Sequence, residues 1–113
     1  MNQRKVRRCL LAIAIALQAH TVSAWDGYAT GKIATIEATS LNNYAFRIWL
    51  EGAPVMCSGG HRWAYMDGAN TNYKVLVSTL LMAKARGAAV STYTLNDASG
   101  NSYCRIEHIA TGD

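Results

Sequence analysis

The positions of three cysteines, Cys9, Cys57 and Cys104, constrain the fold of this 113-residue chain most strongly. Cys9 begins the apolar run CLLAIAIAL, which follows four basic residues and precedes the small residues VSA, ending at Ala24. This pattern is typical of a secretory signal peptide cleaved after Ala24. The run is too short for a helix across a membrane core of about 30 Å. Cys9 therefore leaves with the signal, and the sequence predicts a periplasmic or secreted bacterial protein made of residues 25–113.

Two cysteines remain after this cleavage, in a compartment that favours a disulfide between Cys57 and Cys104. In the chain-entropy model this bond stabilises the fold by roughly 4 kcal/mol, a large share for a small domain. His61 lies four residues after Cys57, as in a thiol nucleophile or a metal site, but zinc needs two further ligands. We expect a structural disulfide, and a loop position for His61 with at most a ligand contact.

Removal of the signal also changes the charge balance. Four of the eleven lysines and arginines lie in the first 24 residues, whereas none of the seven acidic residues does. The formal net charge therefore falls from +4 to zero. The basic surface expected of a nucleic-acid-binding protein is absent, and we predict neither nucleic-acid binding nor membrane insertion after cleavage.

Alternating apolar and polar residues predict strands in the first half of residues 25–113. The clearest is YAFRIWLE at residues 44–51, in which one face carries Phe46, Ile48 and Leu50 and the other Arg47, Trp49 and Glu51. Residues 31–39 predict an earlier strand, and residues 55–57 with 63–66 a short, irregular third strand. This alternation suits a sheet with one face in the core and one in solvent.

A helix is predicted from Tyr73, after the polar, turn-rich residues 67–72. Its apolar stripe consists of Tyr73, Leu76, Val77, Leu80 and Leu81, with Lys84 at its end. Gly87 suits a left-handed cap. Residues 89–95 and 103–109 predict two further strands joined by a hairpin loop, and the last strand places Cys104, Ile106 and His108 on one face.

The order strand, strand, strand, helix, strand, strand is that of the OB-fold, a five-stranded barrel whose helix lies between the third and fourth strands. An open α+β sheet with one helix is the alternative. In both, residues 25–113 form one domain, and the disulfide ties the third strand region to the last strand.

Several short features of the chain occur together in one known family. They are G-x-I-x-x-I at residues 31–36, F-x-I at residues 46–48, Cys57, Trp63 followed by Ala64, and YKVLVSTLLMAKARG at residues 73–87. This combination resembles the binding subunits of the pertussis-like and subtilase-cytotoxin class of AB5 toxins, and small exported bacterial proteins related to them. The resemblance spans nearly all of residues 25–113. It implies an OB-fold, a homopentameric ring, binding of sialylated or other glycans, and catalysis by a separate A chain.

A sugar site needs an aromatic face and a few polar groups that satisfy hydroxyls. Arg47 with Trp49 on the second strand is one candidate, and His61, Arg62 and Trp63 in the loop after Cys57 are another. Core packing of Trp63 and an edge or interface position for Trp49 are the alternative interpretation. We find no catalytic triad, carboxylate pair, phosphate-binding glycine loop or metal-ligand cluster in the sequence, and predict no cofactor.

The sequence thus favours an exported, non-catalytic binding module, and the resemblance implies a glycan-binding relative of toxin B subunits. The alternative is a periplasmic inhibitor or partner of an exported enzyme or envelope protein, which needs only exposed aromatic and arginine side chains on a rigid scaffold. An enzyme with a reactive Cys57 thiol is the third hypothesis.

Overall fold

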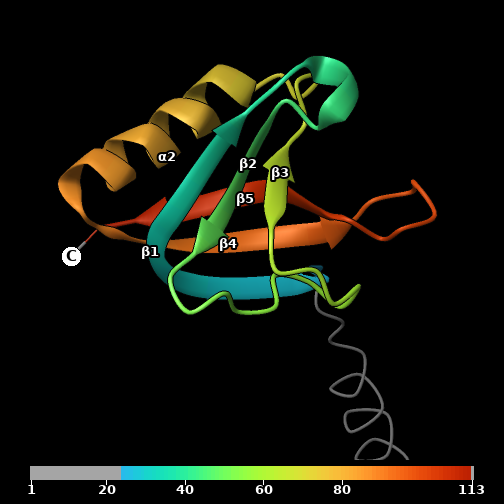
Figure 1. Cartoon of the computed structure of the whole chain (residues 1–113), viewed down its shortest axis with the longest axis horizontal. Coiled ribbons are helices and arrows are strands. Elements are labelled where there is room, and N and C mark those ends of the chain that lie inside the picture. The colour runs from blue at the N-terminus through green and yellow to red at the C-terminus, as the bar shows by residue number, and fades with distance from the viewer. Residues whose placement is uncertain (1–23, 113) are drawn as a thin grey trace, which may run out of the picture.

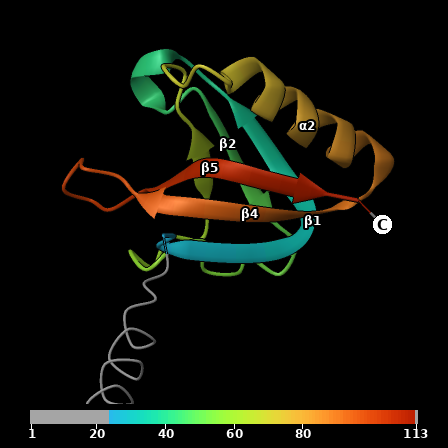
Figure 2. The ribbon, with the colours of Figure 1, turned by 180° about the vertical axis from the view of Figure 1, so that it is seen from behind.

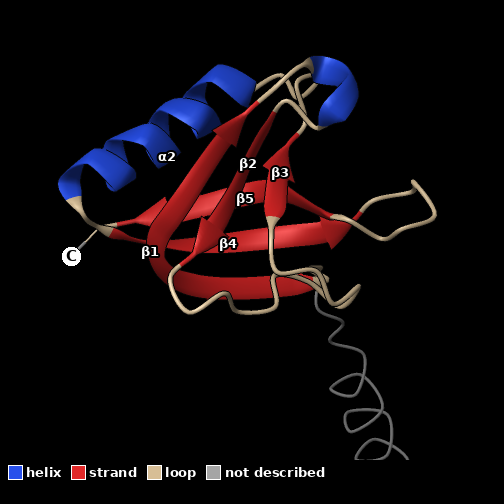
Figure 3. Ribbon diagram, in the orientation of Figure 1, coloured by secondary structure: helices blue, strands red, loops and turns tan. Residues whose placement is uncertain are grey.

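The computed structural model describes residues 24–112, whose elements follow the predicted order of three strands, a helix and two strands (Figure 1). Within these residues the protein is mainly β with one α-helix (Figure 3). The elements are β1 (Gly27–Ala38), the 3-10 helix η1 (Leu41–Asn43), β2 (Phe46–Leu50), β3 (Ala64–Met66), α2 (Tyr73–Arg86), β4 (Ala89–Asn96) and β5 (Cys104–Thr111). The predicted signal peptide lies outside the described residues, apart from Ala24.

The five strands form a closed ring of hydrogen-bonded pairs in the order β1-β2-β3-β5-β4, with β4 pairing again with β1. All neighbours are antiparallel except β3 and β5, which are parallel. The ring closes because the long, curved β1 pairs with β4 through its first half, up to Lys32, and with β2 through its second half, from Ile33 (Figure 1). The open sheet considered from the sequence is therefore not formed.

The predicted alternation in β2 is confirmed, since Phe46, Ile48 and Leu50 are buried while Arg47 and Trp49 are only partly covered. Phe46, Ile48 and Leu50 point into the ring, where they pack in the core with Val90 and Ile106. In Figure 2, β4 and β5 lie side by side and α2 crosses one end of the ring. The helix contributes Leu80 and Ala83 to this core.

The bounds of α2 agree with the sequence pattern, and Gly87 adopts the predicted left-handed conformation, with φ 65°. Two details differ. Asn72 makes no side-chain cap, and instead its N–H donates to Asn70 Oδ1. Leu81, which we predicted on the buried stripe, is 48% exposed. Leu80 and Ala83 are the buried residues of the helix, so the face of the helix that packs on the core does not include Leu81.

Two parts of the sheet differ from the alternation of apolar and polar residues that the sequence predicted. The predicted strand at residues 55–57 is not formed, and only Ala64–Met66 pairs with β2. In β5, Thr94 pairs with Ile106 but Tyr93 pairs with His108, so Glu107 is an extra residue in a β-bulge. This bulge reverses the alternation, and His108 is exposed rather than on the face of Cys104 and Ile106. The prediction for His108 was wrong for this reason.

The predicted disulfide joins Cys57 to Cys104, with Cα atoms 5.6 Å apart. Both residues are buried, so the bond ties the loop before β3 to the start of β5 within the core. A disulfide is consistent with an oxidising, exported compartment. Within residues 24–112, no helix has the length and apolar character to span a membrane.

Candidate functional site

The two site candidates from the sequence lie on one surface, which we call the tryptophan face. It gathers on the outer side of β2 and β3 and on the loops beside them. Its members are Tyr44, Arg47, Trp49, His61, Trp63, Tyr65 and Tyr103, joined in a continuous set of ring contacts.

Arg47 lies beside both indoles of this face, whose ring centres are 6.3 Å apart. Its guanidinium carbon is 5.9 Å from the ring centre of Trp49 and 5.4 Å from that of Trp63, within cation–π range. Arg47 also forms an ion pair with Glu37, its cross-strand neighbour on β1. Both guanidinium nitrogens in this pair donate to Glu37 Oε1. The cation is therefore held in place by an acid on one side and aromatic rings on the other.

Tyr65 belongs to β3, and loops supply the remaining rings, Tyr44, His61, Trp63 and Tyr103. Tyr103 lies 4.9 Å from Trp63, 4.8 Å from His61 and 5.1 Å from Tyr44, measured between ring centres. Tyr44 is half-buried at a left-handed φ of 60°, and Ser102, just before Tyr103, has φ 52°. Such conformations are uncommon for non-glycine residues. The loops thus adopt costly backbone geometry that brings these rings together.

Asp97 organises the loop that carries Tyr103. Its Oδ1 accepts from the N–H groups of Ser99 and Tyr103 and from the Ser99 hydroxyl, and its Oδ2 accepts from the Tyr65 hydroxyl at 2.7 Å. Desolvation raises the pKa of Asp97, but the hydrogen bonds from Ser99, Tyr65 and Tyr103 outweigh it and lower the pKa below its usual value. Burial and the Asp97 carboxylate raise the pKa of Tyr65. The carboxylate is therefore ionised and structural.

His61 is fixed by the same loop, since its Nε2 lies 2.7 Å from the Asn101 carbonyl oxygen. The loop before β3 approaches so closely that a Cβ atom on Gly59 would lie 2.2 Å from the Ser102 carbonyl oxygen. Arg62 is not among the ring contacts. It is exposed, and its Nη1 donates to the Ala53 carbonyl oxygen at 2.6 Å.

Three members of this face, Tyr44, Tyr65 and Tyr103, were not among the sequence candidates. Tyr65 follows Trp63 at a spacing of two, which places both on the same side of an extended segment. That spacing was the available signal. Tyr44 and Tyr103 belong to loops, and nothing local to them indicates that they meet.

A second aromatic surface, the hydroxyl face, lies on the outer side of β1, β4 and β5. It consists of Trp25, Tyr28, Thr30, Ser91, Tyr93 and His108. Two cross-strand pairs form its centre, Tyr28 with Tyr93 and Thr30 with Ser91. The Thr30 and Ser91 hydroxyl oxygens are 2.9 Å apart, and Thr30 donates to the Tyr28 hydroxyl at 2.9 Å.

The rings of the hydroxyl face are more exposed than those of the tryptophan face. Tyr28 is 59% exposed and Trp25 37%. Tyr93 contacts Tyr28 and His108, with ring centres 4.9 Å apart in both cases. Hydrogen bonds with Ser91 and Thr30 lower the pKa of Tyr28 below its ordinary value. The exposed Tyr28 ring, with its own hydroxyl and the two hydroxyls of Thr30 and Ser91 beside it, is thus accessible from solvent.

The sequence did not reveal the hydroxyl face because the first strand was predicted to begin at Gly31, whereas β1 begins at Gly27. Tyr28 and Thr30 alternate with Ala29 and Gly31, whose small side chains give a weak apolar signal. His108 reaches this face through the bulge in β5.

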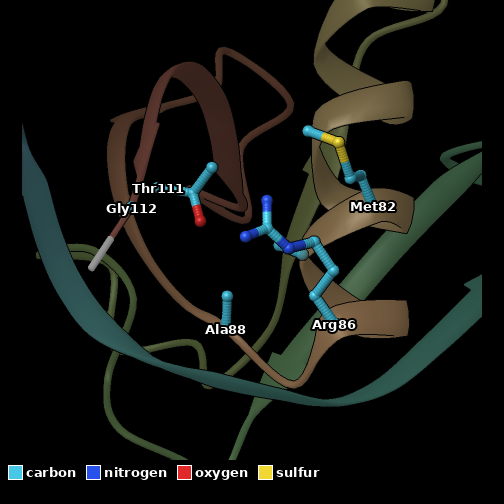
Figure 4. Close-up of a pocket in the computed structure, with 6 residues that line it drawn as sticks. Met82, Arg86, Ala88, Thr111 and Gly112 are labelled. Carbon is cyan, nitrogen blue, oxygen red and sulfur yellow. The ribbon is translucent and has the colours of Figure 1, made fainter.

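The small hollow beside α2 and the metal-ligating residue types were also considered as possible sites among the described residues. A hollow of about 190 Å³ beside the end of α2 is lined by Met82, Ala83, Arg86, Ala88, Thr111 and Gly112 (Figure 4), and is smaller than usual ligand pockets. In Figure 4 the Arg86 side chain extends toward Thr111. No group of three or more His, Cys, Asp or Glu residues suited to a metal ion occurs within residues 24–112.

Comparisons with known proteins add no relative. No family model, curated protein or solved structure matches the chain. The functional argument therefore depends on the geometry of the two faces.

Proposed function

We propose that the protein is an exported, non-catalytic binding module that recognises a saccharide through the hydroxyl face. The observation that carries this proposal is the exposed Tyr28 ring beside the linked hydroxyls of Thr30 and Ser91. The apolar face of a sugar ring packs on an aromatic side chain, while protein hydroxyls both donate to and accept from sugar hydroxyls. No other surface of the described residues joins a largely exposed ring to several hydroxyls.

The architecture supports a more specific form of this proposal. The closed strand order and the helix between β3 and β4 are those expected of an OB-fold, a scaffold used for oligosaccharide binding. The predicted signal peptide and the disulfide support export. Together with the sequence resemblance to AB5 toxin B subunits, these features favour a glycan-binding homologue that assembles as a homopentamer.

The test is a glycan array with the oxidised protein, followed by calorimetry on the best ligand. We expect Tyr28→Ala and Thr30→Ala to weaken binding about tenfold or more, and Trp49→Ala to leave it unchanged. Binding that depends on Trp49 instead of Tyr28 would move the site to the tryptophan face. An array without any ligand would refute saccharide recognition, and a monomer in sedimentation at micromolar concentration would refute the ring.

A second candidate function is the binding of an exported protein partner through the tryptophan face. The observation that favours it is the clustering of Trp49, Trp63 and Arg47, residue types that dominate the energetics of protein interfaces. Affinity capture from a periplasmic extract tests this candidate. A stoichiometric protein retained by the wild type and lost with Trp49→Ala would support it, and equal retention by both would contradict it.

A further inference from the structure

Strand pairing arranges the outward side chains of β1, β4 and β5 in rows that run across the three strands (Figure 2). Successive rows are about 7 Å apart, because a strand rises about 3.4 Å per residue and every second side chain faces outward. The pairing of β1 with β4 is regular over these rows. The first row consists of Tyr28, Tyr93 and His108, the second of Thr30, Ser91 and Ala110, and the third of Lys32 and Ala89.

The first row is aromatic, but it does not offer one flat surface to a chain of sugars that crosses the strands. The ring planes of Tyr28 and Tyr93 are inclined by 57°, and those of Tyr93 and His108 by 71°. A sugar that packs flat on Tyr28 therefore meets Tyr93 at a steep angle, and a second sugar cannot continue the same stack. A longer ligand is better accommodated along the strands than across them.

Along the strands, the surface beyond the hydroxyls of the second row is low. Ala89 and Ala110 are both exposed, and each adds only a methyl group to the outer side of β4 or β5. Lys32 borders this low surface from β1, where its exposed ammonium group carries three N–H donors. The Lys32 carbonyl oxygen accepts from the Glu51 N–H, whereas no ion pair within residues 24–112 includes the Lys32 ammonium group.

We propose, on the basis of the saccharide recognition proposed above, that the hydroxyl face binds an extended oligosaccharide that runs along β1 from Tyr28 to Lys32. One sugar packs on Tyr28 and exchanges hydrogen bonds with the hydroxyls of Thr30 and Ser91. The next sugar lies over the low surface and accepts from Lys32. Equatorial β-1,4 linkages keep a chain of hexoses straight and flat, whereas α-1,4 linkages curve it. The regular rows therefore suit a β-1,4-linked chain of at least two sugars.

The proposal is tested by titrating the isotopically labelled, oxidised protein with glucose, cellobiose and cellotriose and recording amide NMR spectra. The affinity should rise about tenfold or more from glucose to cellotriose, as one or two added hydrogen bonds would give. All three probes should shift the Tyr28 amide, but only cellobiose and cellotriose should shift the Ala89 amide. Maltotriose, which has the same sugars in α-1,4 linkage, should bind no more tightly than glucose.

Variants of the low surface separate the second sugar from the first. Ala89→Phe places a ring where the second sugar would lie, so it should reduce the affinity for cellotriose to that for glucose and leave glucose binding unchanged. Ala98→Phe, the same substitution at an exposed position in the loop after β4, is the matched control and should affect neither probe. Lys32→Gln should weaken cellotriose binding about fivefold, whereas Lys74→Gln, at an exposed position of α2, should not.

Two results would overturn the extended site and leave saccharide recognition through Tyr28 intact. They are equal affinities for glucose and cellotriose, and full retention of cellotriose binding in Ala89→Phe. The failure of cellotriose to bind, together with a different ligand on the glycan array, would also refute the extended site alone, while an array without any ligand would refute both proposals. The amide spectrum of each variant reports folding, and Ala110→Phe replaces Ala89→Phe if the latter unfolds.

Discussion

The tryptophan face and the hydroxyl face differ in what their rings contact. In the tryptophan face, Trp63 lies against Tyr44, Tyr103 and Arg47, so its edges and faces are used within the protein. In the hydroxyl face, Tyr28 contacts one ring, Tyr93, and leaves most of its surface in solvent. The first arrangement stabilises the fold, whereas the second leaves an aromatic surface for a ligand.

The two faces also differ in how they are built. The hydroxyl face consists mainly of cross-strand pairs of regular strands, a geometry that the sheet imposes. The tryptophan face depends on two loops held by Asp97 and by the disulfide. Perturbing these supports therefore distinguishes the faces, and the following predictions run from the largest expected effect to the smallest.

Removal of the disulfide has the largest expected effect. Replacing both Cys57 and Cys104 by alanine should reduce the free energy of unfolding by about 4 kcal/mol, since the loop between them is no longer constrained in the unfolded chain. Urea denaturation measures this loss. Hydrogen exchange should show a greater loss of protection at His61 than at Thr92 in β4. A variant with an unchanged urea midpoint would contradict the structural role of the bond.

Truncation of single rings compares the faces directly. Trp63→Ala should lower the free energy of unfolding by about 2 to 3 kcal/mol, because a partly buried indole loses its packing. His108→Ala, an exposed ring on the hydroxyl face, should change it by less than about 0.5 kcal/mol. Thermal denaturation of both variants provides the comparison. Similar losses in the two variants would show that the faces do not differ in this way.

Asp97→Asn should cost about 2 kcal/mol, since a charged acceptor of several hydrogen bonds is lost. The folded-state pKa of Asp97 is lowered, so its ionisation stabilises the protein fully above the pKa of an unfolded aspartate, about 4, and this stabilisation is lost as the pH falls below that value through the lower folded-state pKa. Urea midpoints between pH 2.5 and 7 measure this. The Asp97→Asn variant should lose less stability on acidification than the wild type.

Glu51→Gln is the control for Asp97, because Glu51 is an exposed carboxylate. The urea midpoint of Glu51→Gln should depend on pH in the same way as that of the wild type. If Asp97→Asn also follows that profile, the carboxylate does not hold the loop.

Thr30→Val has the smallest expected effect on stability, within about 0.5 kcal/mol, because Thr30 is exposed and valine suits a strand. Saccharide affinity should nevertheless fall about five- to tenfold through loss of one hydroxyl. Calorimetry with the ligand from the glycan array measures it. Thr35→Val on the same strand is the control and should retain full affinity; an equal loss there would remove Thr30 from the site.

Local patterns predicted part of the fold correctly. The helix bounds followed from the spacing of its apolar residues and from Gly87, and the alternation in β2 followed from Phe46, Ile48 and Leu50. His108 was misplaced because a bulge depends on the partner strand and breaks the period of two. Leu81 was misplaced because helical spacing does not specify how wide a contact the ring offers.

The candidate site was predicted only in fragments. Arg47 with Trp49, and His61 with Arg62 and Trp63, were recognised as two separate candidates by residue type and spacing, and Arg62 takes no part in the ring contacts. Tyr44 and Tyr103 connect these candidates through ring contacts. Those contacts require two loops that are distant in the sequence to pack against each other, and residue spacing does not predict such packing.

By itself the sequence determined the order of the elements, the limits of the helix and the two cysteines that pair, because these depend on neighbouring residues or on elimination. The tertiary structure alone decided which surfaces exist. Thr30 and Ser91 are 61 positions apart, yet their hydroxyls lie 2.9 Å from each other. Closing β1 onto β4 brings them together, and pairing between distant strands is set by the packing of the whole core rather than by any local segment.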